Sequence, residues 1–383
     1  MELGIFIQAP VLAHNRKGDP DYERRKVMQD LEVAIAADKA GFKYVLATEH
    51  HFLDEYSHLS ANDVILSYLA HATERIHLVS AIFNPLPNVI HPAKLAETVA
   101  MLDLVSGGRF EFGTGRGAGS HEILGFLPGM SDLTGTREIW EDVIAEFPKM
   151  WLNDVYPGYD GKFWSLPPRK ILPKPFGNSH PPMWYACGNT TSYEMAARRG
   201  LGVLGFSVGS FDDMAPVIKN YKGNIGNAEP VGAFVNDNIL VTVNCFVSED
   251  PAKAVAQFCE PDQSYFLSNV FRYHDTFPHP ETIPYWPELV PTMTPDMVGY
   301  AQAGGTVIGD PDHAIEQLKR WESAGADQVI IPCGVAKHED TLEMIRLMGE
   351  HVIPKIDKDP VHRTTHMRNS VTVRAETDGV AAR

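Results

Sequence analysis

Eight short apolar segments, separated by longer helical patterns, limit the fold of this 383-residue chain more than any other feature. They are rich in β-branched and aromatic residues, as buried strands are. Amphipathic helix patterns lie between them, such as residues 22–41, where Leu31 and Ile35 share one face and Gly41 ends the pattern. Alternating strands and helices indicate a parallel sheet, and eight strands close a (β/α)8 barrel, a TIM barrel. A doubly wound open sheet is the alternative. The strand candidates span residues 3–8, 44–50, 77–83, 109–115, 182–187, 202–207, 239–248 and 328–333.

Three stretches depart from this alternation. Residues 152–181 are rich in Pro, Gly and aromatic residues, and we interpret them as an insertion before the fifth strand. Residues 260–300 follow the seventh strand, are weakly periodic, and have the length and composition of a lid. Residues 358–383 lack apolar periodicity, which predicts a mobile tail or a segment lying over a partner subunit. We therefore expect one barrel domain over residues 1–357.

Charge and cysteine spacing limit the partners and the compartment. A formal charge of −16 argues against nucleic acid and against anionic membrane surfaces. The acidic Glu2 and a short apolar run make the first residues resemble a strand rather than a signal peptide, and no apolar run reaches membrane-spanning length. Four widely spaced cysteines, at 187, 245, 259 and 333, indicate free thiols, so we expect a cytoplasmic protein.

The end of the second strand carries Glu49, His50 and His51. Active sites of such barrels form at the carboxyl ends of the strands. Successive strand residues point to opposite faces, so both histidines cannot face the barrel mouth, which argues against a metal held by the pair. The chain also lacks H-x-H and H-E-x-x-H, so we expect no metal site. A single histidine here could equally be a hydrogen-bonded structural side chain.

Two further strand ends offer groups that suit an anion. Residues 113–122 (GTGRGAGSHE) combine close-approach glycines with the positive charge of Arg116, but the third glycine of a dinucleotide fingerprint is missing. Residues 188–192 (GNTTS) run directly into a helix. The two could hold one phosphate from two sides. The simpler interpretations are a tight turn and helix N-caps.

Several motifs occur together in one order along the chain. In this order and over roughly residues 1–355, they resemble the bacterial luciferase-like family of flavin-dependent monooxygenases. The motifs are EHHF (49–52), SAIFN (80–84), LDLVSGGRFEFGTGRG (102–117), GNTTSYEMAARRG (188–200) and GDPDHAIEQLKRWESAGADQVII (309–331).

The resemblance implies a (β/α)8 barrel, usually dimeric, with reduced FMN at its mouth. By position, the FMN phosphate would be bound by Arg116, Gly188, Asn189 and Ser192. Gly188 and Asn189 replace the acidic and serine residues of luciferase itself. This departure argues against light emission and leaves the substrate open.

The resemblance also assigns residues around the flavin ring. Ala81 and Ile82 would back the isoalloxazine, where the family often has a non-proline cis peptide. His50 matches the histidine implicated in catalysis. Gly115 stands where luciferase has a reactive cysteine.

The leading hypothesis is an FMNH2-dependent two-component monooxygenase. A separate NAD(P)H:flavin reductase would supply FMNH2, and a peroxyflavin formed with O2 would transfer one oxygen atom to a small, apolar organic substrate. Exclusion of water would require a lid, for which residues 260–300 supply aromatic side chains such as Tyr265, Phe266 and Tyr273. The alternatives are an F420-dependent hydride-transferring oxidoreductase and a flavin-binding subunit without activity. We further expect a homodimer.

Overall fold

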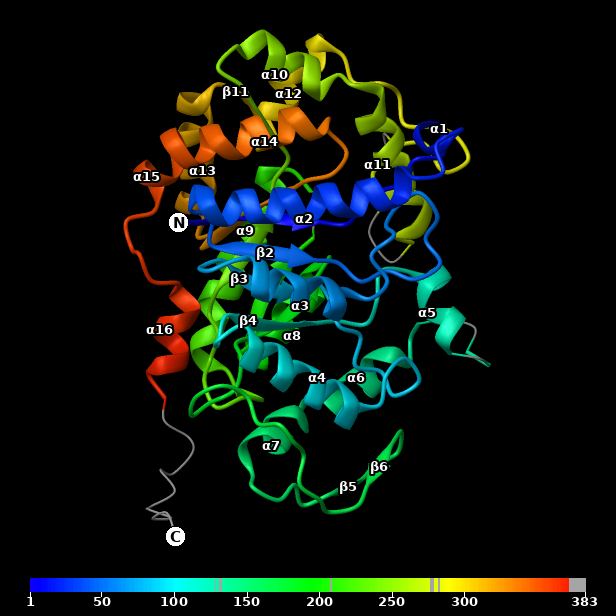
Figure 1. Cartoon of the computed structure of the whole chain (residues 1–383), viewed down its shortest axis with the longest axis vertical. Helices are drawn as coiled ribbons and strands as arrows, with labels where there is room; N and C mark the ends of the chain where they lie inside the picture. The colour runs from blue at the N-terminus through cyan, green and yellow to red at the C-terminus, as the bar shows by residue number, and fades with distance from the viewer. Residues whose placement is uncertain (128, 131–132, 207–208, 276–278, 282, 372–383) are drawn as a thin grey trace.

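A closed barrel of eight parallel strands forms the centre of the computed structural model (Figure 1). The structure describes residues 1–127, 129–130, 133–206, 209–275, 279–281 and 283–371. The predicted (β/α)8 barrel is confirmed, and the open sheet is wrong, because the first strand pairs with the last and closes the ring. Its strands, in order around the ring, are β1 (Glu2–Ile7), β2 (Tyr44–Ala47), β3 (His77–Ser80), β4 (Phe110–Thr114), β7 (Met183–Cys187), β8 (Gly202–Gly205), β9 (Ile239–Thr242) and β12 (Gln328–Pro332).

Each predicted segment contains one barrel strand, but the seventh also contains a second strand. After β9 the chain leaves the barrel at the exposed Asn244, and β10 (Cys245–Val247) pairs with β11 (Val307–Gly309) in a separate sheet. Both halves of residues 239–248 are apolar, so hydrophobicity alone could not show this division. Residue 207, at the end of the sixth segment, lies outside the described residues.

Helices surround the barrel in the expected alternation. Those that follow single strands are α2 (Tyr22–Ala40), α3 (Asn62–Ala72), α4 (Pro92–Val105), α8 (Thr190–Arg198), α9 (Phe211–Asn224) and α14 (His338–Leu347). The longer connections and the chain ends contribute α1 (Ala13–Arg16), α5 (Ser120–Phe126), α6 (Thr136–Ile144), α7 (Phe147–Leu152), α10 (Pro251–Phe258), α11 (Pro261–Tyr273), α12 (Val298–Ala303), α13 (Pro311–Ala324), α15 (Ile353–Ile356) and α16 (Arg363–Asn369). As predicted, α2 ends at Gly41, which adopts a φ of 93° that favours glycine. Within the described residues, no helix is long and apolar enough to cross a membrane.

The two irregular stretches carry structure of their own. Residues 152–181 contain a short antiparallel hairpin, β5 (Tyr159–Asp160) with β6 (Ser165–Leu166), which lies beside α7 (Figure 1). Residues 260–300 begin with α11, a helix of 13 residues rather than a loop. Residues 276–278 and 282 of this stretch lie outside the described residues.

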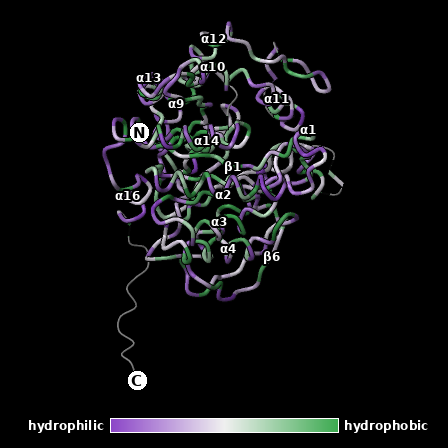
Figure 2. The backbone as a smooth tube through the Cα atoms, turned by 45° about the horizontal axis from the view of Figure 1, so that its top comes forward, coloured by the Kyte–Doolittle hydropathy of each residue, from purple (hydrophilic) through white to green (hydrophobic). Residues whose placement is uncertain are grey.

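Apolar side chains fill the barrel and the layer between strands and helices. Backbone segments of high hydropathy lie mostly inside the fold and hydrophilic ones mostly outside (Figure 2). Alternate strand residues point to the barrel axis, as the period of two requires. This inner cluster consists of Phe6, Tyr44, Leu46, Val79, Ala81, Ile82, Trp184, Leu204, Leu240 and Ile330.

The amino-terminal end of the barrel, which we call the floor, is covered by α16 (Figure 1). Arg368 donates to both carboxylate oxygens of the fully buried Asp103, at 2.8 and 2.6 Å. Thr364 donates its hydroxyl to Glu111 at 2.5 Å. The expectation of a mobile tail is therefore corrected for residues 363–369. These residues are anchored by single polar contacts to buried carboxylates, which no apolar periodicity reveals. Residues 372–383 lie outside the described residues.

Candidate active site

The predicted site residues follow four consecutive strands of the barrel. His50 comes after β2, Ala81 and Ile82 after β3, Arg116 after β4, and residues 188–192 after β7. These strands are hydrogen-bonded neighbours in parallel register. Their carboxyl ends therefore gather on one side of the barrel mouth, the opposite end from α16 (Figure 1).

His50 is held at the mouth by a buried carboxylate. Its Nδ1 lies 3.2 Å from Oε2 of Glu122, and both side chains are at most 10% exposed. Glu122 also accepts hydrogen bonds from the backbone N–H groups of Ala118 (3.2 Å) and His51 (3.3 Å). Burial by itself would raise the pKa of Glu122, but the charge and hydrogen bond of His50 outweigh it and leave the pKa below its usual value. With Nδ1 engaged, Nε2 is the ring nitrogen left for proton transfer.

Glu49 and His51 interact with each other. His51 Nε2 lies 3.5 Å from Glu49 Oε1, and this contact raises the pKa of the His51 imidazole. The side chains of the two histidines have different carboxylate partners. Among the described residues, no group of three or more His, Cys, Asp or Glu side chains is arranged to hold a metal ion.

Rings from the segment after β2 and from α11 pack near His50. Tyr56, after β2, packs edge-on against His50 with ring centroids 5.2 Å apart, and Phe266, on α11, stacks on Tyr56 at 5.3 Å. His274, just after α11, contacts the Tyr56 hydroxyl through Nε2 at 2.8 Å. Burial and then the nearby His50 lower the pKa of His274 to about 3, so its imidazole is neutral at physiological pH. Part of the predicted lid-like stretch thus lies against the catalytic candidate.

The wall beside His50 is formed by Ala81, Ile82, Gly115 and Ala186. The peptide bond between Ala81 and Ile82 is cis, as the resemblance led us to expect. A Cβ on Gly115 would lie only 3.2 Å from both Ile82 Cγ1 and Ala186 Cβ. Glycine at this position therefore allows Ile82 and Ala186 to approach the β4 end closely.

Arg116 extends from β4 toward β7. Its Nε donates to the Tyr185 hydroxyl at 3.2 Å and its Nη1 to Thr136 Oγ1 at 2.9 Å. Both partners are neutral, and among the described residues no carboxylate forms a salt bridge with Arg116. Its positive charge is therefore uncompensated and suits an anion.

The 188–192 turn caps α8. Asn189 Oδ1 accepts from the Ser192 N–H at 3.1 Å, and Ser192 Oγ accepts from the Asn189 N–H at 3.2 Å, which forms a capping box. The N-cap interpretation is confirmed for this turn: Asn189 is the N-cap, and Ser192 completes the capping box from the third helical position. Thr190 and Thr191 stay exposed at the helix N-terminus, whose dipole favours anions. The two roles are compatible, because backbone N–H groups and hydroxyls are left for a phosphate.

Three buried oxygens around the mouth have no hydrogen-bond partner among the described residues. They are Oε1 of Gln8, Oγ1 of Thr48 and Oγ1 of Thr242. Each residue lies two positions beyond an inward-facing residue of β1, β2 or β9. Buried polar atoms are rarely left unpaired, so a polar ligand at the mouth fits the surrounding residues.

A sequence profile of the luciferase-like monooxygenases matches residues 1–328. The chain belongs to the luciferase-like monooxygenase family. Membership confirms the predicted family and makes the protein an oxidoreductase of the monooxygenase kind. The chain is 26% identical over 373 residues to the oxygenase component of the flavin-dependent trigonelline monooxygenase of Acinetobacter baylyi, covering 95% of this chain and 98% of that protein.

Solved structures of two other proteins share the fold of this luciferase-like chain. The oxygenating constituent of 3,6-diketocamphane monooxygenase from Pseudomonas putida, solved with FMN, superposes with a TM-score of 0.71 at 17% identity, covering 93% of this chain and 98% of that one. The coenzyme F420-dependent tetrahydromethanopterin reductase of Methanopyrus kandleri superposes with a TM-score of 0.61 at 18% identity, covering 92% and 98%. At these identities the likeness establishes the fold alone.

Sequence reasoning missed Glu122, Tyr56 and His274. Glu122 lies within the 113–122 motif, but no local signal shows that it reaches the second strand end 72 positions earlier. His274 belongs to the stretch already singled out for its aromatic residues. The signal that could have found His274 is that it is a histidine, a residue type that usually has polar partners, inside a predicted lid.

Proposed function

We propose that this protein is the oxygenase component of a two-component flavin-dependent monooxygenase. It would use FMNH2 from a separate NAD(P)H:flavin reductase to insert one oxygen atom from O2 into a small, mainly apolar organic molecule. The observation that carries the proposal is the buried His50–Glu122 pair at the barrel mouth, where Gly115 leaves no side chain between Ile82 and Ala186. The relatives named above support a flavin as the cofactor.

The residues at the mouth fit FMN in its two parts. Arg116 offers an uncompensated charge, and the N-terminus of α8 offers N–H groups and hydroxyls, for the phosphate. Ala81 and Ile82, with Gly115, offer an apolar surface for one face of the ring system. Reduced FMN, when bound, supplies the electrons that activate O2.

His50 would hold and move the proton that the oxygen transfer requires. Its Nδ1 contact with Glu122 fixes the ring and leaves Nε2 to take up or release the proton. Tyr56 and Phe266 cover the ring and keep water from it. The covering helix α11 is fastened at several points, such as Tyr265 to Glu55 at 2.8 Å. We propose that it acts as the lid.

We also propose a homodimer and a cytoplasmic location. An exposed apolar face on the adjoining helices α3 and α4 supports the dimer, since contiguous apolar surface marks interfaces. It consists of Val64, Tyr68, Met101, Leu104 and Val105. The four cysteines are free, which suits a reducing compartment. Sedimentation of the wild type and of Val64→Asp would test the dimer: the variant should sediment as a monomer.

Anaerobic titration tests the cofactor assignment. FMNH2, reduced riboflavin and reduced F420 are added in turn while flavin fluorescence and absorbance are followed. FMNH2 should bind more tightly than riboflavin, and Arg116→Ala should remove that difference. Arg198→Ala, which changes an exposed arginine of α8, serves as the control.

Admission of oxygen then separates the alternatives. Reoxidation of bound FMNH2 with kinetics that depend on His50 would support the monooxygenase. Tight F420 binding without oxygen consumption would replace it with the F420-dependent hydride-transferring enzyme. FMNH2 binding with reoxidation unaffected by His50→Ala would favour a flavin-binding subunit without activity.

A further inference from the structure

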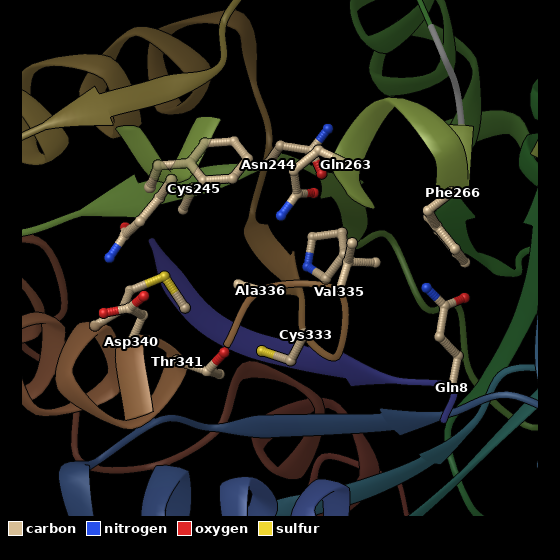
Figure 3. A pocket seen from close by; sticks show the side chains of 14 residues that line it. Gln8, Asn244, Cys245, Gln263, Phe266, Cys333, Val335, Ala336, Asp340 and Thr341 are labelled. Atoms are coloured by element: carbon tan, nitrogen blue, oxygen red, sulfur yellow. The ribbon is translucent and has the colours of Figure 1, made fainter. Parts of the chain in front are cut away.

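A cavity lies beside the barrel mouth, between the carboxyl ends of β1, β9 and β12 and the covering helices α10, α11 and α14 (Figure 3). Its empty space, counted together with the solvent at its open side, is about 560 Å³. Gln8 and Phe266 lie at one end, and Cys245 and Asp340 lie at the other, so the cavity is elongated (Figure 3).

The Gln8 end borders the site described above. Phe266, which lines the cavity, stacks on Tyr56 with ring planes 5° apart, and Tyr56 packs against His50. Gln8 lies two residues beyond Phe6, which points to the barrel axis. A molecule in the cavity is therefore separated from His50 at this end by two aromatic rings, those of Phe266 and Tyr56.

The polar lining consists mainly of carboxamides. Gln8, Asn244, Gln257 and Gln263 all line the cavity, and among its described lining residues there is no lysine or arginine. The one carboxylate, Asp340, is paired with Lys253 at 2.7 Å. A carboxylate ligand would find no compensating cation here, and burial of an unpaired charge is costly. The lining thus favours an uncharged molecule.

The carboxamide of Gln8 indicates which hydrogen-bonding group that molecule must carry. Gln8 is only 3% exposed, and its Oε1 has no hydrogen-bond partner among the described residues. An unpaired buried acceptor is satisfied by an N–H or O–H donor. Phe246, Phe266 and Met344 supply apolar surface for the remainder of the ligand.

We propose that this cavity binds the organic substrate, and that the substrate is a neutral, mainly apolar molecule whose O–H or N–H group donates to Gln8 Oε1. This assignment rests on the proposed monooxygenase function and specifies its substrate class. Gln8 is a specificity-determining residue in this scheme, and the cofactor residues are separate from it.

Three probes of similar size test the assignment by ligand-observed NMR. Benzyl alcohol carries the donor, benzyl methyl ether lacks it, and benzoate is anionic. Benzyl alcohol should bind about fivefold to tenfold more tightly than the ether, as one satisfied buried acceptor predicts. Benzoate should bind most weakly.

Gln8→Leu should weaken the binding of benzyl alcohol to the level of the ether and leave the binding of the ether unchanged. Gln317→Leu is the matched control, because Gln317 also has a buried, unpartnered carboxamide oxygen but lies on α13 and does not line the cavity. Equal binding of alcohol and ether by the wild type would overturn the proposal without any variant. If Gln8→Leu binds neither benzyl alcohol nor the ether while its thermal unfolding is unchanged, the proposed role of Gln8 is overturned.

Titration of the same samples with FMNH2 keeps this proposal distinct from the function. If FMNH2 binds but none of the probes shows saturable binding, the substrate cavity is wrong and the flavin function stands. If benzyl alcohol binds in the expected order but FMNH2 does not, the cavity assignment keeps its ligand class and the monooxygenase function fails.

Discussion

The two ends of the barrel differ in how many of their buried polar groups are paired, although Gln328 Oε1 at the floor is also unpaired among the described residues. At the floor, Glu111 receives hydrogen bonds from Trp184 (2.6 Å) and Thr364 (2.5 Å), and Asp103 is paired with Arg368. At the mouth, Gln8 and its neighbours leave acceptor oxygens unpaired, and the charge of Arg116 has no carboxylate partner in the described part of the chain. The floor therefore contributes stability, whereas the mouth is built to pair with something that binds.

The largest expected effect is at the floor. Asp103→Ala should destabilise the protein by about 3–5 kcal/mol, because Arg368 would remain buried without its partner. Urea unfolding measures this loss. FMNH2 affinity of the folded fraction should not change, since the mouth lies at the other end of the barrel.

A matched control is Glu138→Ala, which breaks the exposed pair with Lys162. It should cost less than about 1 kcal/mol. If both variants cost the same, the floor does not stabilise the fold through its buried pair. If Asp103→Ala weakens FMNH2 binding in proportion to its instability, the two ends are not independent.

Glu111 should make the free energy of unfolding depend on pH, with a total change of about 3 kcal/mol. Burial raises the pKa of its carboxyl to about 7, although the hydrogen bonds from Thr364 and Trp184 oppose the rise. The unfolded carboxyl titrates near 4.5, so the folded state holds its proton to higher pH. This group therefore lowers the free energy of unfolding as the pH rises from about 4.5 to 7. Glu111→Gln should abolish that fall.

Neighbouring histidines also titrate, so the useful measurement is the difference in the free energy of unfolding between Glu111→Gln and the wild type. Burial lowers the pKa values of His77 and His362 to about 3, which gives a slope of the opposite sign between about pH 3 and 6.5. Both proteins contain these histidines, so subtracting the free energy of unfolding of the wild type from that of Glu111→Gln removes most of their slope. The difference reports Glu111 together with its coupling to His77, whose Nδ1 lies 2.6 Å from the Glu111 carboxylate. A difference that stays constant from pH 4.5 to 7 would show that Glu111 keeps its ordinary pKa.

The sequence predicted the barrel well because its signal is local and repeated. Each strand is an apolar run with its own flanking helix, and Gly41 marks a helix end by backbone preference alone. His50 and Arg116 were found because they stand directly after such strands. Glu122, His274 and the docking of α16 were missed, since each depends on a few polar contacts between residues far apart in the chain.

At the mouth, Glu122→Gln should slow the reoxidation of bound reduced FMN by about tenfold to a hundredfold. The amide oxygen can still accept from the Ala118 N–H, but the amide nitrogen cannot accept from the His51 N–H, and the negative charge beside His50 is lost. Stopped-flow absorbance after mixing with oxygen measures the rate. The dependence of that rate on pH should also shift, which a purely structural role would not cause. An unchanged rate and pH profile would remove Glu122 from the catalytic scheme.

The smallest effect separates the two roles of the 188–192 turn. Asn189→Ala removes the N-cap of α8 and should cost about 1 kcal/mol in stability. Asn189→Asp keeps a capping oxygen but adds a negative charge where the phosphate is expected, so the free energy of unfolding should be retained while FMN affinity falls. Riboflavin, which lacks the phosphate, should bind the Asp variant and the wild type equally. If FMN also binds both equally, the turn is a helix cap only, and the phosphate site must be sought elsewhere around Arg116.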